Sequence, residues 1–164
     1  MSAYDAGMAT DKDFTPAEWQ QIEAAPFMAA LAITYGDLSS KKGIADEAAA
    51  TGEAIKGAGG SASEIVRTLA ARFVAGQRPT MPSIPNAPAE AQAALVDGCK
   101  AALGLVRAKA PAEAEVFARF LLDTAMATAN ASREGGIMGI GFAKVSEGET
   151  MALAQLALAL GLPQ

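Results

Sequence analysis

Apolar residues recur along most of the chain at spacings of three and four, the pattern of helices that bury one face. The clearest helix start is at Pro16. Thr15 and Glu18 have the spacing of a capping box, and Phe14 and Trp19 stand at the two positions of a hydrophobic staple. Because these signals are independent of one another and agree, we predict a helix that begins at Pro16.

Pro26 interrupts this first helical pattern. Proline lacks an N–H donor and disfavours helical geometry at the residue before it, so we expect a kink or a restart there. Residues 27–35, which follow, are apolar on nearly every side. A helix of that kind is usually central, which predicts that this segment is surrounded by the others.

The remaining helices are predicted from the same periodicity and from caps. We expect them at about 40–56, after a capping box at Ser61–Glu64, at about 88–109, from Pro111 onward, and from Ser146 to a stop at Gly161. Residues 77–88 hold four prolines, so we expect an extended connection there and the one candidate boundary between two half-bundles. No stretch shows sustained period-two alternation rich in β-branched residues, so no strand is predicted.

The composition supports an all-α fold. Roughly a quarter of the residues are alanine, which is the best helix former and lets helix backbones approach closely. With 51% hydrophobic and 19% charged residues, the chain can fill a core. We therefore predict a single-domain bundle of five to six closely packed helices over residues 14–164, after a disordered tail at residues 1–13.

Charge and residue content exclude several functions. The net charge is −5, and lysines and arginines are scattered apart from Lys41 and Lys42, so we expect no nucleic-acid binding. There is no histidine, which removes histidine-based catalysis and histidine metal sites. Cys99 is the single cysteine and lies in phase with Leu95 and Leu103, which predicts a buried structural thiol. We expect no cofactor.

The chain also lacks the marks of export or membrane insertion. The first residues contain no apolar run of the kind found in signal peptides, and the longest uncharged apolar stretches are too short to span a membrane. The cytoplasm is therefore the expected compartment.

The segment between the last two helices contains two candidate sites. Asn130, Ser132 and Glu134 carry oxygens at the first positions of an EF-hand-like loop, but Gly141 stands where a bidentate glutamate is required. An irregular cation site using Glu134, Glu147 or Glu149 remains open, and a solvated polar loop is the alternative.

Glycines in the same segment separate four apolar side chains, which are Ile137, Met138, Ile140 and Phe142. The spacing fits neither nucleotide-binding fingerprint. These side chains either fold back to cap the core, or form an apolar lid or docking surface that binds a small ligand.

Residues 125–162 resemble the second helix–loop–helix of TerB-like proteins, the tellurite-resistance-associated helical family. The shared features are an alanine-rich helix, a polar loop, Val145-Ser-Glu-Gly-Glu149 and a final helix that ends in Leu160-Gly-Leu162. The resemblance implies an all-helical fold and metal binding through loop carboxylates. Of the family's acidic positions, only Asp37 and Glu134 have counterparts here. The whole chain also resembles small bacterial all-helical proteins, which imply no particular activity.

These observations favour a non-enzymatic interaction domain. Residues 27–35 and 151–160 are apolar on more faces than a small domain can always bury, so we expect a homo-oligomer. The alternative is a protein that binds a small apolar molecule or a cation through the 130–149 loop. An enzyme is the third class that remains open.

Overall fold

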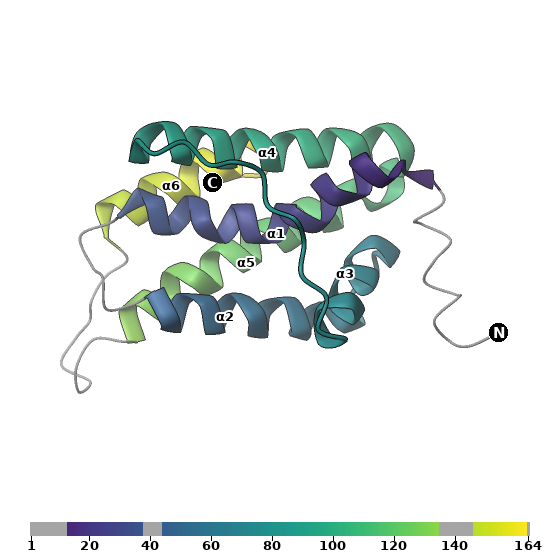
Figure 1. Ribbon diagram of the computed structural model, residues 1–164, viewed down its shortest axis with the longest axis horizontal. Helices are drawn as coiled ribbons and strands as arrows, with labels where there is room; N and C mark the ends of the chain where they lie inside the picture. The colour runs from purple at the N-terminus through teal and green to yellow at the C-terminus, as the bar shows by residue number, and fades with distance from the viewer. Residues whose placement is uncertain (1–12, 38–43, 135–145, 164) are drawn as a thin grey trace.

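A computed structural model describes residues 13–37, 44–134 and 146–163. Within them, six α-helices are joined by two short 3-10 helices, and no strand occurs in the described part (Figure 1). The elements are α1 (Pro16–Gly36), α2 (Ile44–Gly57), η4 (Ala58–Gly60), α3 (Glu64–Val74), α4 (Pro88–Lys109), η5 (Pro111–Glu113), α5 (Ala114–Glu134) and α6 (Glu147–Ala159). The predicted all-α bundle is confirmed. The predicted tail, except for Asp13, lies outside the described residues.

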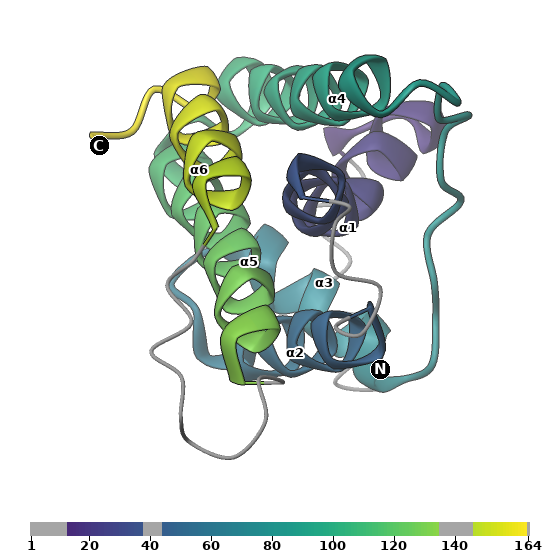
Figure 2. The same ribbon diagram turned by 90° about the vertical axis from the view of Figure 1, so that its left-hand side faces the viewer.

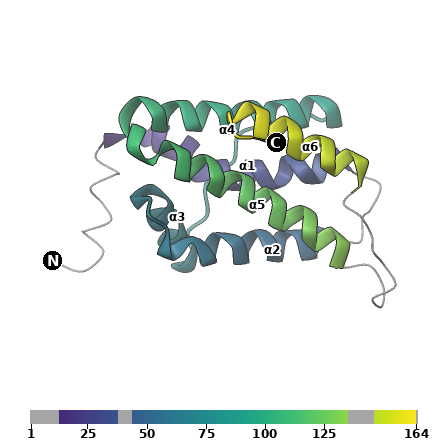
Figure 3. The same cartoon turned by 180° about the vertical axis from the view of Figure 1, so that it is seen from behind.

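The helix α1 is the centre of the bundle, as its apolar composition predicts. It contacts α4, α5, α6 and α2. Seen along the bundle (Figure 2), α4 covers it from above, α6 and α5 from one side and α2 from below. Figure 3 shows α5 and α6 from behind. Residues 75–87, here called the connection, join α3 to α4 without a helix and cross α1 on its remaining side (Figure 1).

The start of α1 has the predicted geometry. The Thr15 hydroxyl accepts a hydrogen bond from the Glu18 N–H at 3.2 Å, and the Thr15 N–H donates to the Glu18 carboxylate at 2.9 Å. The rings of Phe14 and Trp19 lie 5.9 Å apart. Lys109 Nζ, at the end of α4, pairs with Glu18 at 2.6 Å, and the resulting hydrogen bond is the first cause of the lowered pKa of Glu18. The cap therefore also fixes α1 against α4.

Pro26 does not restart the chain, which corrects one of the two outcomes expected there. α1 continues through it as one helix, and both Ala25 and Pro26 are buried. The Cys99 thiol of α4 donates to the Ala25 carbonyl at 3.4 Å, so a neighbouring helix contributes a bond at this turn. Burial raises the pKa of Cys99 to about 12 and leaves the side chain without exposed surface, which confirms the predicted buried thiol.

The start of α3 differs from the prediction. Ser63, not Ser61, is the N-cap, and its hydroxyl accepts from the Val66 N–H at 3.1 Å. The carboxylate of Glu113 in η5 accepts from the Ser63 hydroxyl at 2.8 Å and from the Ile65 N–H at 3.0 Å. A residue distant in sequence therefore accepts from one of the N–H groups that the first turn of α3 leaves without a partner inside the helix.

One hydrophobic core holds the described helices together, and residues from both sides of the connection contribute to it. Its largest fully buried side chains are Ile22, Ile33, Ile55, Ile65, Val66, Leu95, Leu103, Val106, Phe117, Leu121, Leu156 and Leu160. Small residues allow a close helix contact at the crossing of α1 and α6, where a Cβ built on Gly36 would lie 2.9 Å from the Cβ of Ala152. None of the described helices is both long and apolar enough to cross a membrane.

Candidate functional site

A groove of about 470 Å³ opens between α1 and α2. The connection, which contributes to its lining, runs along this side of the bundle (Figure 2). The groove's volume lies in the range of small-molecule sites, which are concave, mostly apolar and contain a few polar groups. Most of its wall is apolar and comes from α1, α2, α3 and the connection, through Phe27, Ala30, Leu31, Ala48, Gly52, Phe73, Pro79 and Met81. We refer to it as the strap groove, because the connection forms one of its edges.

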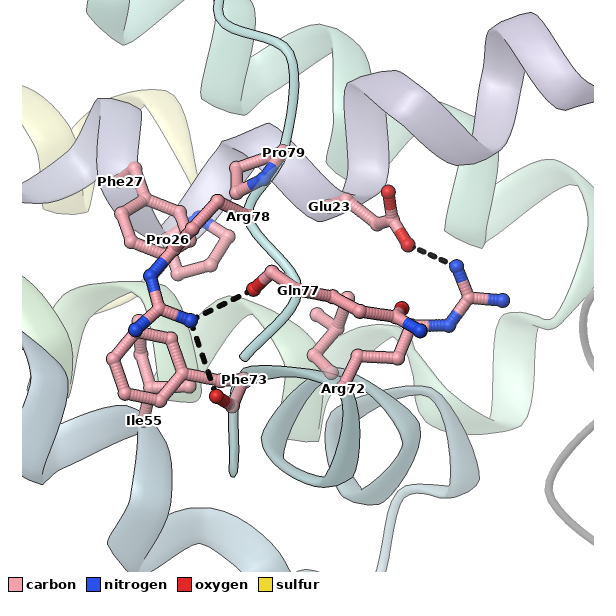
Figure 4. A pocket seen from close by; sticks show the side chains of 10 residues that line it. Glu23, Pro26, Phe27, Ile55, Arg72, Phe73, Gln77, Arg78 and Pro79 are labelled. Atoms are coloured by element: carbon pink, nitrogen blue, oxygen red, sulfur yellow. Dashed lines mark hydrogen bonds and ion pairs between the residues drawn. The ribbon is translucent and has the colours of Figure 1, made fainter. Parts of the chain in front are cut away.

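One end of the strap groove is aromatic. The rings of Phe27 and Phe73 lie 6.1 Å apart, and the guanidinium of Arg78 lies 4.0 Å from the centre of the Phe73 ring. Arg78 donates to the carbonyls of Phe73 at 3.1 Å and of Gln77 at 2.8 Å (Figure 4). Gly52 faces Phe73, and a Cβ there would lie 3.1 Å from the ring. The cation, the ring and the connection therefore hold one another in place.

A second, much smaller cavity of about 80 Å³ adjoins this aromatic end and shares Phe27, Phe73 and Arg78 with the groove (Figure 4). Its far side is closed by Glu23 and Arg72, which form an ion pair. Glu23 also accepts from the Trp19 indole N–H at 2.7 Å. The Glu23–Arg72 ion pair joins α1 to α3 across this small cavity.

The other end of the strap groove is polar. The Thr34 hydroxyl donates to the Glu47 carboxyl at 2.7 Å. Thr51, one turn further along α2, donates to the Glu47 carbonyl at 2.7 Å, and its oxygen lies 2.9 Å from the hydroxyl of Thr128 in α5. These four residues all line the groove. A carboxyl and three hydroxyls therefore meet at the end of an otherwise apolar wall.

The carboxyl of Glu47 is in an unusual environment for an acid, because the residue is only 8% exposed. Burial is the largest cause of its raised pKa, and the negative charges of Glu149 and Asp37 act in the same direction. The hydrogen bond from Thr34 acts in the opposite direction without cancelling them. Titratable groups with raised pKa values in a cleft are typical of functional sites.

Two other hollows, each of about 520 Å³, have fewer polar groups arranged to bind a ligand. One lies between α1, the connection and α4, and its described lining residues include no charged side chain. The other lies between α2, α3 and α5 and includes Arg119 and Asp123, both exposed. Arg119 pairs with Glu115 at 3.6 Å on the helix surface. We therefore regard the strap groove as the candidate site.

The residues predicted for a cation site are not gathered by the part of the chain that the structure describes. Glu147 is exposed, whereas Glu149 is only 4% exposed, and the side chain of Glu134 lies outside the described part. Among described side chains, no group of three or more acidic or cysteine residues is arranged to hold a metal ion. The cation site stays a prediction.

The apolar residues predicted to bind a ligand, which are Ile137, Met138, Ile140 and Phe142, all lie outside the described residues. That site stays a prediction as well. The groove that the structure does describe uses none of them.

Sequence reasoning missed Glu47 and the groove's threonines as site residues. Thr34 and Thr51 stand among apolar residues at helical spacing, which alone does not single them out. A signal was nevertheless present, because Glu47 and Thr51 stand one turn apart on a helix whose other inward residues are apolar. Polar residues that share a buried face need partners, and here they partner one another.

Compared with known proteins, the chain matches no protein-family model, no curated protein and no solved structure. The resemblance to TerB-like proteins therefore stays a prediction, and the function has to be argued from the groove itself.

Proposed function

We propose that this protein binds a small, largely apolar molecule in the strap groove and performs no chemistry on it. The observation that carries the proposal is a mostly apolar wall with a cluster of hydrogen-bonding groups at one end and Arg78, which is bonded to main-chain carbonyls, at the other. Such an arrangement can bury an apolar body while the polar end fixes its orientation. Binding of a small apolar molecule is the alternative function expected from the sequence. The proposed binding site, however, lies between α1, α2 and the connection instead of in the 130–149 loop. The cytoplasm is the compartment we propose for it.

A direct test blocks the groove without disturbing the core. Ala48 lines the groove and is exposed, so Ala48→Phe adds a ring to the cavity at little cost to folding. Ala49 is its neighbour, is also exposed and does not line the groove, so Ala49→Phe is the matched control.

The readout is the fluorescence of the uncharged dye Nile red titrated with each protein. We expect saturable binding to the unmodified chain and to Ala49→Phe, and at least tenfold weaker binding to Ala48→Phe. Equal binding by all three proteins, or none by the unmodified chain, would contradict the proposal.

Self-association is a second candidate function, and one observation favours it. Met151 and Leu158 of α6 are 62% and 71% exposed, and their spacing of seven residues places them on one face of the helix. We propose a second copy of this chain as the partner of that face. Leu158→Glu should then halve a dimeric mass measured by light scattering, and an unmodified chain that is monomeric at high concentration would exclude it.

A further inference from the structure

The charges along the strap groove are arranged with opposite signs at its two ends. Glu47 and Arg78 are the only charged residues among its described lining residues. Glu47 is bonded to Thr34, whereas Arg78 lies beside Phe27 and Phe73. Phe27 and Thr34 are seven positions apart on α1, which corresponds to roughly 10 Å at the helical rise. The groove therefore has an acidic end and a basic end about two helical turns apart.

The threonine hydroxyls at the acidic end already donate their protons in hydrogen bonds within the protein. Each threonine hydroxyl has one proton to donate and lone pairs to accept with. Thr34 donates to the Glu47 carboxyl, Thr51 to the Glu47 carbonyl and Thr128 to the Thr124 carbonyl. What these groups offer to a molecule in the groove is therefore acceptor capacity. A ligand group at this end has to be a hydrogen-bond donor.

The electrostatic environment selects the charge of that donor. Glu47 feels the negative charges of Glu149 and Asp37, and folding has already removed its carboxyl from most of the solvent. A cation placed there offsets the repulsion and adds a positively charged partner to the carboxylate, whereas an anion increases the repulsion. At the opposite end, the guanidinium of Arg78 repels a cation and so favours one orientation of the ligand.

We propose that the ligand of the strap groove is an amphiphilic amine, whose ammonium group binds Glu47 and the threonine hydroxyls and whose apolar body lies along Phe27, Leu31 and Met81. An ammonium carries three N–H donors and no acceptor, which matches an acceptor-rich acidic end. A carboxylate brings only acceptors to this end, and an alcohol brings a single donor. The inference rests on the proposed function, since it names the class of molecule that the groove binds.

The test compares head groups on one chain length. Octylamine, octanol and octanoate share the same apolar tail and differ only in the group that meets Glu47. Each is used near neutral pH to displace Nile red from the full-length protein. We expect octylamine to compete at least tenfold more strongly than octanol, and octanoate to be the weakest. This comparison uses the unmodified chain, so it does not depend on how well any variant folds.

Two variants then test whether Glu47 causes the preference for octylamine over octanol. Glu47→Gln removes the charge and keeps an acceptor for Thr34, and it should reduce octylamine competition about tenfold while octanol competition changes far less. Glu53→Gln, an exposed glutamate of the same helix, is the matched control and should behave as the unmodified chain.

The outcomes separate this inference from the proposed function. Equal competition by octylamine and octanol, or stronger competition by octanoate, would overturn the amine assignment while the groove remains a binding site. Failure of Nile red itself to bind would overturn both.

Discussion

The hydroxyl oxygens of Thr51 and Thr128 lie 2.9 Å apart and join α2 to α5 at the polar end of the strap groove. Both side chains are buried, and each is also within hydrogen-bonding distance of a main-chain carbonyl one turn earlier in its own helix. Two hydroxyl protons therefore serve three contacts, and the arrangement retains acceptor capacity. The same pair contributes to the stability of the bundle and to the chemistry of its groove.

Replacing one member of this pair should have a modest cost. Thr51→Val keeps the shape of the side chain and removes its hydroxyl, so we predict a loss of roughly 1 kcal/mol in the free energy of unfolding. Thr51→Ser keeps the hydroxyl and serves as the control. The measurement is urea denaturation, and a valine variant at least as stable as the unmodified protein would show that the contact contributes nothing.

The buried acid should make stability depend on pH. Because the pKa of Glu47 is raised in the folded protein, the unfolded chain ionises first as pH rises, and the folded state loses stability between the ordinary and the raised value. Glu47→Gln cannot ionise. We predict that its melting temperature exceeds that of the unmodified protein at about pH 7 and that the difference shrinks toward about pH 4.

The control for this pH series is Glu53→Gln, which removes an exposed charge from the same helix. The difference in melting temperature between Glu53→Gln and the unmodified protein should not widen in the same way as the pH rises. A Glu47→Gln advantage that grows as pH falls would contradict the assigned direction of the shift.

Two glycines should respond in opposite ways to alanine. A Cβ on Gly148 would overlap the carbonyl of Gly36 at the crossing of α6 and α1, so Gly148→Ala should cost roughly 1–3 kcal/mol. Gly104 in α4 has open space around it, and Gly104→Ala should stabilise the helix by roughly 0.5–1 kcal/mol. Thermal denaturation of both variants checks the prediction, and the same sign for both would refute this account of the crossing.

The cap of α1 gives a further stability prediction. Thr15→Ala removes the oxygen that accepts from the Glu18 N–H, and we expect a loss of about 1 kcal/mol. Thr15→Ser retains that oxygen and should be close to neutral. An unchanged denaturation midpoint for the alanine variant would mean that the first turn of α1 contributes little to the folded state.

The parts of the fold that depend only on residues close together in the sequence could be predicted from it. The cap at Thr15 and the stop at Gly161, whose φ is +69°, are local, and so are the start and end of α4. Predictions failed where a distant residue intervenes. Glu113 shifts the cap of α3 to Ser63, and packing in the core carries α1 through Pro26.

The groove could not be predicted for the same reason. Its residues come from α1, α2, α3, α5 and the connection, and each of them taken alone has an ordinary position on a helix face or in a loop. The prolines of residues 77–88 predict an extended segment, but nothing in their spacing says which helix it crosses. Only the packing of α2 and α5 beside α1 brings Thr128 to Thr51 and turns separate polar residues into one cluster.

The most direct test of the central claim is a titration of methionine-methyl-labelled protein with octylamine, followed by NMR. Met81 lines the strap groove, whereas Met126 and Met151 are exposed on α5 and α6 and serve as internal controls. The account predicts a saturable shift of the Met81 methyl signal and unchanged signals from the two controls. An unchanged Met81 signal, or shifts that begin at Met126 or Met151, would contradict it.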